Sequence, residues 1–218
     1  MIELSLLNEL NAETKDERLG ALTRAVARAS FPPVDPRMVN NHIHTSYSFS
    51  PYSPSAAVYA ARAEGLATCG IVDHDSIGGA REFIEAGKIV GIPTTIGIET
   101  RVSFAETPLK DKRTNNPDQI GNTYMVLHAV PHDKIETVQA YFAPLRARRN
   151  ARNRKMVERI NELYKSEGIS LDFDRDVLPL SQYANGGSVT ERHLMLALAR
   201  QLIRLGKASL PEHASELE

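Results

Sequence analysis

The sequence predicts an α/β fold built around a parallel sheet, and two observations carry this prediction. Short apolar runs typical of strands lie at residues 38–44, 67–73, 92–99 and 123–130. Segments with helical periodicity separate the first three runs, which is the order of elements in βαβ units. The central parts of two runs, 69–72 and 125–127, are almost wholly apolar, as expected of strands that are covered on both faces.

Three helices are predicted before and between these strands, at residues 14–30, 54–65 and 76–87. Each has a residue at or before its start that commonly caps helix N-termini, namely Thr14, Ser53 and Ser76. After Pro131 the pattern is mostly helical, and one helix face is expected to carry Val157, Ile160, Leu163 and Tyr164. The sequence therefore predicts an α/β part followed by a helical part.

Composition narrows the class of protein. The chain has 218 residues, 42% of them apolar, and no apolar stretch approaches the roughly 20 residues that span a bilayer. The N-terminus lacks a basic start and an apolar signal core, so we expect a cytoplasmic protein with no membrane partner. A net charge of −1 gives no global attraction to nucleic acid. Cys69 is the single cysteine, which excludes an intrachain disulfide, and is expected to be a buried thiol.

Three histidines and one glutamate lie where predicted strands end. His42 and His44 are two residues apart, so on an extended segment their side chains point to the same side. His74 follows the second apolar run, and Glu99 ends the third. The carboxyl ends of parallel strands share one edge of a sheet. A lone histidine is more often a core or surface residue, but four candidates at one edge favour a metal site. Asp73 is expected to accept a hydrogen bond from a ligand imidazole and is therefore a candidate catalytic residue.

These segments carry a family resemblance. Asn41-His42-Ile43-His44-Thr45-Ser46, Gly70-Ile71-Val72-Asp73-His74-Asp75-Ser76 and Gly97-Ile98-Glu99 resemble the polymerase and histidinol phosphatase (PHP) family over about residues 39–130. The resemblance implies a distorted (β/α)7 TIM-like barrel and hydrolysis of phosphoesters by metal-activated water. It also implies a site for two or three divalent metal ions, with His42, His44, His74 and Glu99 as ligands and Glu99 as the bridging, catalytic carboxylate. Zn, Mn or Fe ions all suit such histidine and carboxylate donors.

The helical part resembles an insertion found in some family members, more loosely and as far as residue 206. Thr190-Glu191-Arg192-His193 resembles an Arg-x-His segment of that insertion, so Arg192 and His193 are expected to bind substrate, a phosphorylated small molecule or a nucleotide. Further cations crowd the preceding helix, at Arg146, Arg148, Arg149, Arg152, Arg154 and Lys155. Because these positions spread around the helix, a solvated face is favoured over a phosphate-binding arm.

The sequence departs from the family pattern in three ways. Phe49 stands where relatives often carry a ligand aspartate, which puts one metal position in doubt. Tyr124 stands where many relatives carry a histidine, and His128, four residues on along the same side of the strand, is expected to replace it as a metal ligand. The closing His-Pro and Asp-x-His motifs of the barrel do not occur.

We therefore interpret the chain as the N-terminal portion of a longer barrel. Residues 1–37 would form an N-terminal helix and linker, 38–131 the first half of the barrel and 132–218 the helical insertion, with the barrel end missing. An incomplete barrel leaves an open strand edge, which predicts homo-oligomerisation or low stability.

Three functions compete at this stage. A metal-dependent phosphoesterase leads. An amidohydrolase-like metal enzyme would also open with His-x-His, but such enzymes usually need a bridging lysine, and no predicted strand ends in one. The third reading is a catalytically inactive PHP module with a scaffold or metal-binding role, which Phe49 and the missing barrel end favour.

Overall fold

The computed structural model describes residues 2–115 and 119–208. Within them the helices are Leu4–Leu10 (α1), Lys15–Val26 (α2), Pro54–Ala63 (α3), Ala80–Val90 (α4), Ile135–Leu163 (α5) and Glu191–Arg204 (α6). The strands are Asp35–Ile43 (β1), Leu66–Ile71 (β2), Thr94–Ile96 (β3), Ile98–Ser103 (β4) and Asn122–Leu127 (β5). Short 3₁₀ and π turns connect α5 to α6. None of the described helices is both long and apolar enough to cross a membrane.

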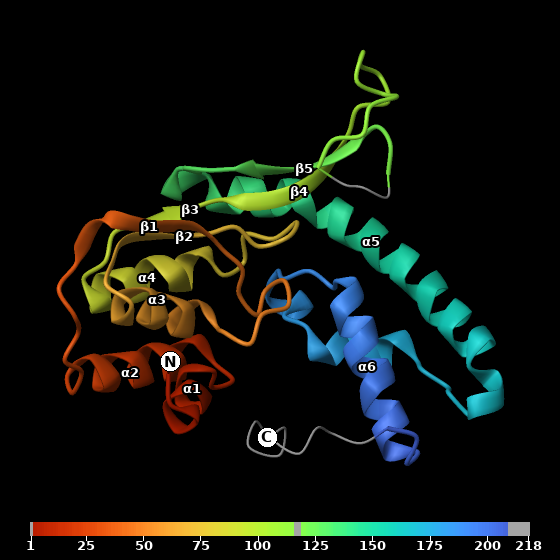
Figure 1. Cartoon of the computed structure of the whole chain (residues 1–218), viewed down its shortest axis with the longest axis horizontal. Coiled ribbons are helices and arrows are strands. Elements are labelled where there is room, and N and C mark those ends of the chain that lie inside the picture. Colours follow the sequence, from red (N-terminus) through yellow and green to blue (C-terminus); the bar gives the residue numbers. More distant parts are fainter. Residues whose placement is uncertain (1, 116–118, 209–218) are drawn as a thin grey trace.

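A parallel three-stranded sheet in the order β1-β2-β3 forms one layer of the molecule. The helices α3 and α4 pack on one face of this sheet, and α1 and α2 form a further layer beneath them (Figure 1). The core between these layers buries Val58, Ile71 and Phe83 completely or almost completely. Cys69 is also buried there, as predicted, and burial raises the pKa of its thiol to about 12.

The predicted parallel sheet is confirmed for the first three strands and wrong for the last. β5 runs antiparallel to β4, with Glu99 opposite Val126, so these strands form a separate hairpin. The predicted third strand breaks at Gly97, where a Cβ atom would lie 2.6 Å from the carbonyl oxygen of Leu127. Met125 and Leu127 are 52% and 56% exposed, so the expected cover on both faces of β5 is absent within the described residues. Among the described residues, the three-stranded sheet and the β4-β5 hairpin do not close into a barrel. The (β/α)7 barrel therefore stays a prediction.

The N-terminal caps predicted from the sequence are present in two of the three predicted helices. The capping box of Thr14 and the cap of Ser53 are both present, as predicted. The third helix begins four residues later than expected, because the Ser76 hydroxyl donates to the carbonyl oxygen of Gly186 instead of capping a helix. The first predicted helix ends at Val26, before residue 30, and α1 was not predicted at all.

The helical part has a second core that shares no residue with the first. It is built by α5, α6 and the turns between them, and it buries Val157 and Ile160 against Leu194 and neighbouring residues. Leu163 and Tyr164, predicted on the same face, are exposed. We propose that the chain divides into two parts at residue 131. The start of α5 nevertheless packs on the first core. Residues 209–218 of the predicted helical part lie outside the described residues.

A buried ion pair joins the helical layers beneath the sheet. The guanidinium of Arg18 on α2 binds the Glu82 carboxylate on α4 through two hydrogen bonds, of 2.5 and 2.9 Å. The hydroxyl of Ser55 on α3 donates to the same carboxylate at 2.8 Å. Both charged side chains are almost completely buried. Removing one charge would leave the other buried without compensation, which costs far more than losing an exposed ion pair.

We predict that Glu82→Ala lowers the free energy of unfolding by about 3–5 kcal/mol, because Arg18 would remain buried and unpaired. Urea unfolding measures this change. The matched control is Glu85→Ala on the same helix, since Glu85 pairs with Lys15 at the surface and its loss should cost less than about 1 kcal/mol. Equal losses in the two variants would contradict a stabilising role for the buried pair.

Candidate metal centre

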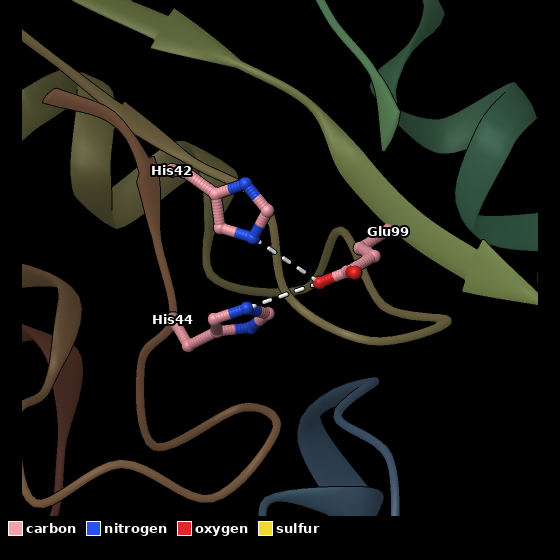
Figure 2. Close-up of side chains that lie close together, drawn as sticks. All are labelled: His42, His44 and Glu99. Atoms are coloured by element: carbon pink, nitrogen blue, oxygen red, sulfur yellow. Dashed lines mark ion pairs between the residues drawn. The ribbon is translucent and has the colours of Figure 1, made fainter. Parts of the chain in front are cut away.

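Three imidazoles surround the carboxylate of Glu99. Its Oε2 lies 3.3 Å from Nε2 of His42, 3.1 Å from Nε2 of His44 and 3.6 Å from Nδ1 of His74. Figure 2 shows the rings of His42 and His44 directed from the end of β1 toward this carboxylate on β4. The rings of His44 and His74 stack with their centroids 4.5 Å apart. The structure thus brings together the three histidines and the glutamate that the sequence singled out.

The backbone explains why these side chains meet. β1 and β2 are paired in parallel, so their carboxyl ends lie side by side. The ladder continues past β2, where the N–H of Glu99 donates to the carbonyl of Asp73 and the N–H of Asp75 donates to the carbonyl of Glu99. His74 and Glu99 therefore form a parallel bridge. Because only Gly97 separates β3 from β4, the chain continues past the sheet far enough to carry Glu99 to the imidazoles.

The donor set suits a divalent cation. One donor atom each from His42, His44 and Glu99 lies within 4.8 Å of the other two. A tetrahedral ion with bonds of about 2.0–2.2 Å holds its donors roughly 3.4 Å apart, so small side-chain movements would let these three share an ion. Nitrogen and carboxylate donors fit Zn, Mn or Fe ions. The side chain of Glu99 is 12% exposed, which keeps most water away from its charge.

Asp73 acts on the cluster through Ser48. We expected it to bind a ligand imidazole directly, and this is wrong, because its buried carboxylate accepts hydrogen bonds from the N–H and hydroxyl of Thr45 and from the hydroxyl of Ser48, each 2.6 Å long. The single hydroxyl proton of Ser48 is used in that bond. Nδ1 of His44, 3.3 Å from the same oxygen, must then be the donor, which leaves Nε2 of His44 with a free lone pair facing Glu99.

Burial keeps the imidazoles in the form that binds a cation. It lowers the pKa of His44 to about 4, an effect that the nearby His74 reinforces and Glu99 opposes. Burial also lowers the pKa of His74, with a further contribution from the guanidinium of Arg149. Both shifts favour the neutral form of the ring. Burial raises the pKa of Asp73 to about 6, although the bonds from Ser48 and Thr45 oppose the rise.

A cavity of about 230 Å³ opens beside the cluster. It is lined by Ser48, His74, Tyr124, Arg149, Thr190, Glu191 and Arg192. Two guanidinium groups therefore stand at the wall next to an imidazole of the cluster, and guanidinium groups bind phosphate oxygens well. Larger hollows lie beside α6 and beside α1, but neither is lined by a residue of the cluster.

Asp75 holds one of these guanidinium groups in place. Its carboxylate, 9% exposed, pairs with Nη2 of Arg149 on α5 and accepts a 2.5 Å hydrogen bond from the hydroxyl of Thr100 on β4. The backbone carbonyl of Asp75 accepts a further bond from Arg146. One residue thus ties α5 to the end of β2 and to β4. The sequence assigned no separate role to Asp75, although it follows His74 directly, and named Arg149 only within a group of cations for which a solvated face was favoured.

Three other predicted site residues, Arg192, His193 and His128, lie outside the cluster of metal-binding donors. Arg192 is exposed at the cavity wall. His193 is 1% exposed, and its Nδ1 accepts a hydrogen bond from the N–H of Thr190 at the start of α6. Phe49, with a φ of 83°, packs edge-on against the His193 ring. His128 is exposed beyond the end of β5 and is not among the clustered donors of the described residues. Substrate and metal binding by Arg192, His193 and His128 stay predictions.

We predict that His42→Ala, His44→Ala and Glu99→Ala each lower the affinity for Zn²⁺ or Mn²⁺ by at least about 100-fold, because each removes one of the clustered donors. Ser48→Ala should lower it by about 10–100-fold, since it releases the ring of His44. Calorimetric titration of metal into stripped protein measures both effects. His132→Ala, which removes an exposed histidine outside the cluster, is the control, and equal losses there would exclude a site at these residues.

We predict that His193 makes the fold less stable in mild acid. Burial lowers the pKa of His193 to about 4, while the unfolded chain titrates near its ordinary 6.5. From pH 6.5 down to 4 only the unfolded chain binds this proton, so the free energy of unfolding falls with pH, by up to about 1.4 kcal/mol per unit. His193→Gln keeps a hydrogen-bond acceptor at the helix start and cannot titrate. Chemical unfolding should show a smaller loss between pH 6.5 and 4.5 in this variant, and parallel curves would contradict the prediction.

The chain is similar to a known protein family and to a curated bacterial protein. Residues 40–170, more than half of the chain, match the model of the PHP domain family. A 5′-3′ exoribonuclease of Haemophilus influenzae is 27% identical over 168 residues, which cover 77% of this chain and 51% of that protein. The chain thus spans about half the length of this relative.

Two solved structures share the fold at low sequence identity. One is a candidate metal-dependent phosphoesterase from Bifidobacterium adolescentis, with a TM-score of 0.57 and 23% identity over 84% of this chain and 56% of that one. The other is an amidohydrolase from Chromobacterium violaceum, with a TM-score of 0.54 and 20% identity over 76% of this chain and 54% of that one. The likeness to both structures is one of fold. Because the family model spans both the clustered donors and the start of the helical part, the chain belongs to the PHP domain family.

Proposed function

We propose that this chain is the metal-binding part of a phosphoesterase that acts on nucleotide or oligonucleotide phosphates. The observation that carries the proposal is the position of the cluster of imidazoles and carboxylate beside a cavity whose wall holds Arg149 and Arg192. Metal-ligand donors and guanidinium groups in one cavity match the chemistry of a phosphoester, whose oxygens bind both. The Haemophilus relative, named as an exoribonuclease, supports a polynucleotide as the wider substrate class.

The clustered donors and Asp73 have different roles in this proposal. His42, His44 and Glu99 would hold one divalent cation, and His74, whose Nδ1 also approaches Glu99, would contribute to binding a second. Such cations polarise phosphoryl oxygens and make water more acidic. Asp73 is a positioning residue, because it fixes His44 through Ser48 and does not reach the cavity itself.

Arg149 would orient the phosphate. Its pairing with Asp75 restrains the guanidinium, and its side chain is 15% exposed, so little rotamer freedom remains to be lost when an anion binds. Arg192 is exposed in the first turn of α6, where it lines the cavity, and would add a second, more mobile contact. His193 would also fix the start of α6, and so the place of Arg192, because its Nδ1 accepts a hydrogen bond from the N–H of Thr190.

Two alternatives have specific observations behind them. An inactive module is favoured by Phe49, whose ring packs on His193 where relatives often carry a ligand aspartate. An amidohydrolase-like enzyme is favoured by the fold it shares with the Chromobacterium protein. Among the described residues, however, none of the five strands ends in the lysine that such enzymes usually need.

We predict that protein loaded with Mn²⁺ or Zn²⁺ releases phosphate from nucleotides, and that Arg149→Ala raises KM by roughly 10–100-fold, because a charge-assisted bond to the phosphate is lost. The control is Arg154→Ala on the same helix, since Arg154 pairs with Asp174 at the surface, away from the cavity. Steady-state phosphate release measures both variants.

The outcomes separate the three functions. Metal binding without turnover of any phosphoester would support the inactive module. Turnover of amides or lactones but not of phosphoesters would support the amidohydrolase-like enzyme. An unchanged KM in Arg149→Ala, with phosphate release intact, would remove Arg149 from the proposed phosphate site.

A further inference from the structure

One face of α5 carries a narrow row of cations with an exposed aromatic ring at its start. Tyr141, Arg148, Arg152, Lys155 and Arg159 stand at positions i, i+7, i+11, i+14 and i+18. At 3.6 residues per turn, these five positions fall within about 60° of the helix circumference. We call them the α5 stripe. The other arginines of this helix, which made the cations look dispersed in the sequence, lie on different faces.

The stripe is accessible and electrostatically unbalanced. Tyr141 is 72% exposed, so most of its ring is accessible to solvent. Arg148 and Lys155 are exposed and have no ion pair among the described residues. Arg152 pairs with Glu191, and Arg159 with Glu162. No acidic residue shares this face between Tyr141 and Arg159, whereas an ordinary solvated helix face mixes both signs.

The stripe is continuous with the proposed phosphate cavity. Arg152 of the stripe pairs with Glu191, and Glu191 lines the cavity. Arg149, one turn before, faces into the cavity from the neighbouring side of the helix. From Arg148 to Arg159 the stripe is about 16 Å long. α5 carries it away from the two sheets, along the side of the molecule where α6 also lies (Figure 1).

We propose that the α5 stripe binds a single-stranded oligonucleotide whose terminal phosphate occupies the cavity. This inference rests on the proposed function. Rows of cations follow a phosphate backbone, and exposed aromatic rings stack with unpaired bases, so the two together fit a single strand. A mononucleotide would fill the cavity without reaching the stripe. The stripe would therefore favour longer substrates over mononucleotides.

The first test measures binding of a fluorescently labelled single-stranded oligoribonucleotide to the full chain by anisotropy at several salt concentrations. We expect Arg148→Ala combined with Lys155→Ala to weaken binding at least about tenfold and to lower the slope of log K against log salt by about 1.4, because two phosphate contacts are lost. Tyr141→Ala should weaken binding about tenfold, and Tyr141→Phe, which keeps the ring, should not.

The matched control removes the same two charges elsewhere. Arg28→Ala combined with Lys88→Ala changes exposed cations on α4 and after α2, in the helical layers below the sheet. Binding should be unchanged in this control. Equal binding by the stripe variant and the control would overturn the proposal and leave the stripe as a solvated helix face.

Hydrolysis separates this inference from the function on which it rests. If the stripe variant loses more activity toward an oligonucleotide than toward a mononucleotide, both hold. If no variant or wild-type protein hydrolyses either substrate but stripe-dependent binding persists, the phosphoesterase proposal fails and the stripe proposal stands. If mononucleotide and oligonucleotide hydrolysis fall by the same factor in the stripe variant, the stripe proposal is wrong while the phosphoesterase proposal survives.

Discussion

The backbone pairing between the segment after β2 and Glu99 on β4 is the constraint on which the site depends. Two hydrogen bonds, from Glu99 to Asp73 and from Asp75 to Glu99, place one carboxylate beside the imidazoles that end β1 and β2. The side chains of the three consecutive residues Asp73, His74 and Asp75 then contact three different parts of the structure. Asp73 turns inward to Thr45 and Ser48, His74 faces Glu99, and Asp75 turns toward α5. Metal donors, tautomer control and the placement of an arginine all follow from this register.

The donor cluster was predictable from the sequence because two simple geometric rules place it. His42 and His44 share one side of an extended strand, and parallel strands bring their carboxyl ends together, so the positions of the predicted strand ends indicated which side chains meet. The helix start at Thr14 was also predictable, since its cap depends on residues three positions apart. The start of α4 was not, because Ser76 binds Gly186, which is far away in the chain.

The misses share one physical cause, which is dependence on long-range packing. The direction of β5 is set by the hairpin that follows Gly97, and alternation of apolar residues does not encode direction. The role of Arg149 is set by its pairing with Asp75, 74 residues away in the chain, while its sequence context looked like an ordinary charged helix. The cations on α5 looked dispersed until helical geometry separated the faces, with Arg149 toward the cavity and Arg148 and Lys155 in the row on the outer side.

Anomalous X-ray diffraction from crystals of protein loaded with Zn²⁺ or Mn²⁺ would show whether His42, His44 and Glu99 share a divalent cation. We expect an anomalous peak about 2.0–2.2 Å from Nε2 of His42, Nε2 of His44 and a carboxylate oxygen of Glu99. A peak bound by other residues, or no peak at this position in a fully loaded crystal, would contradict this expectation.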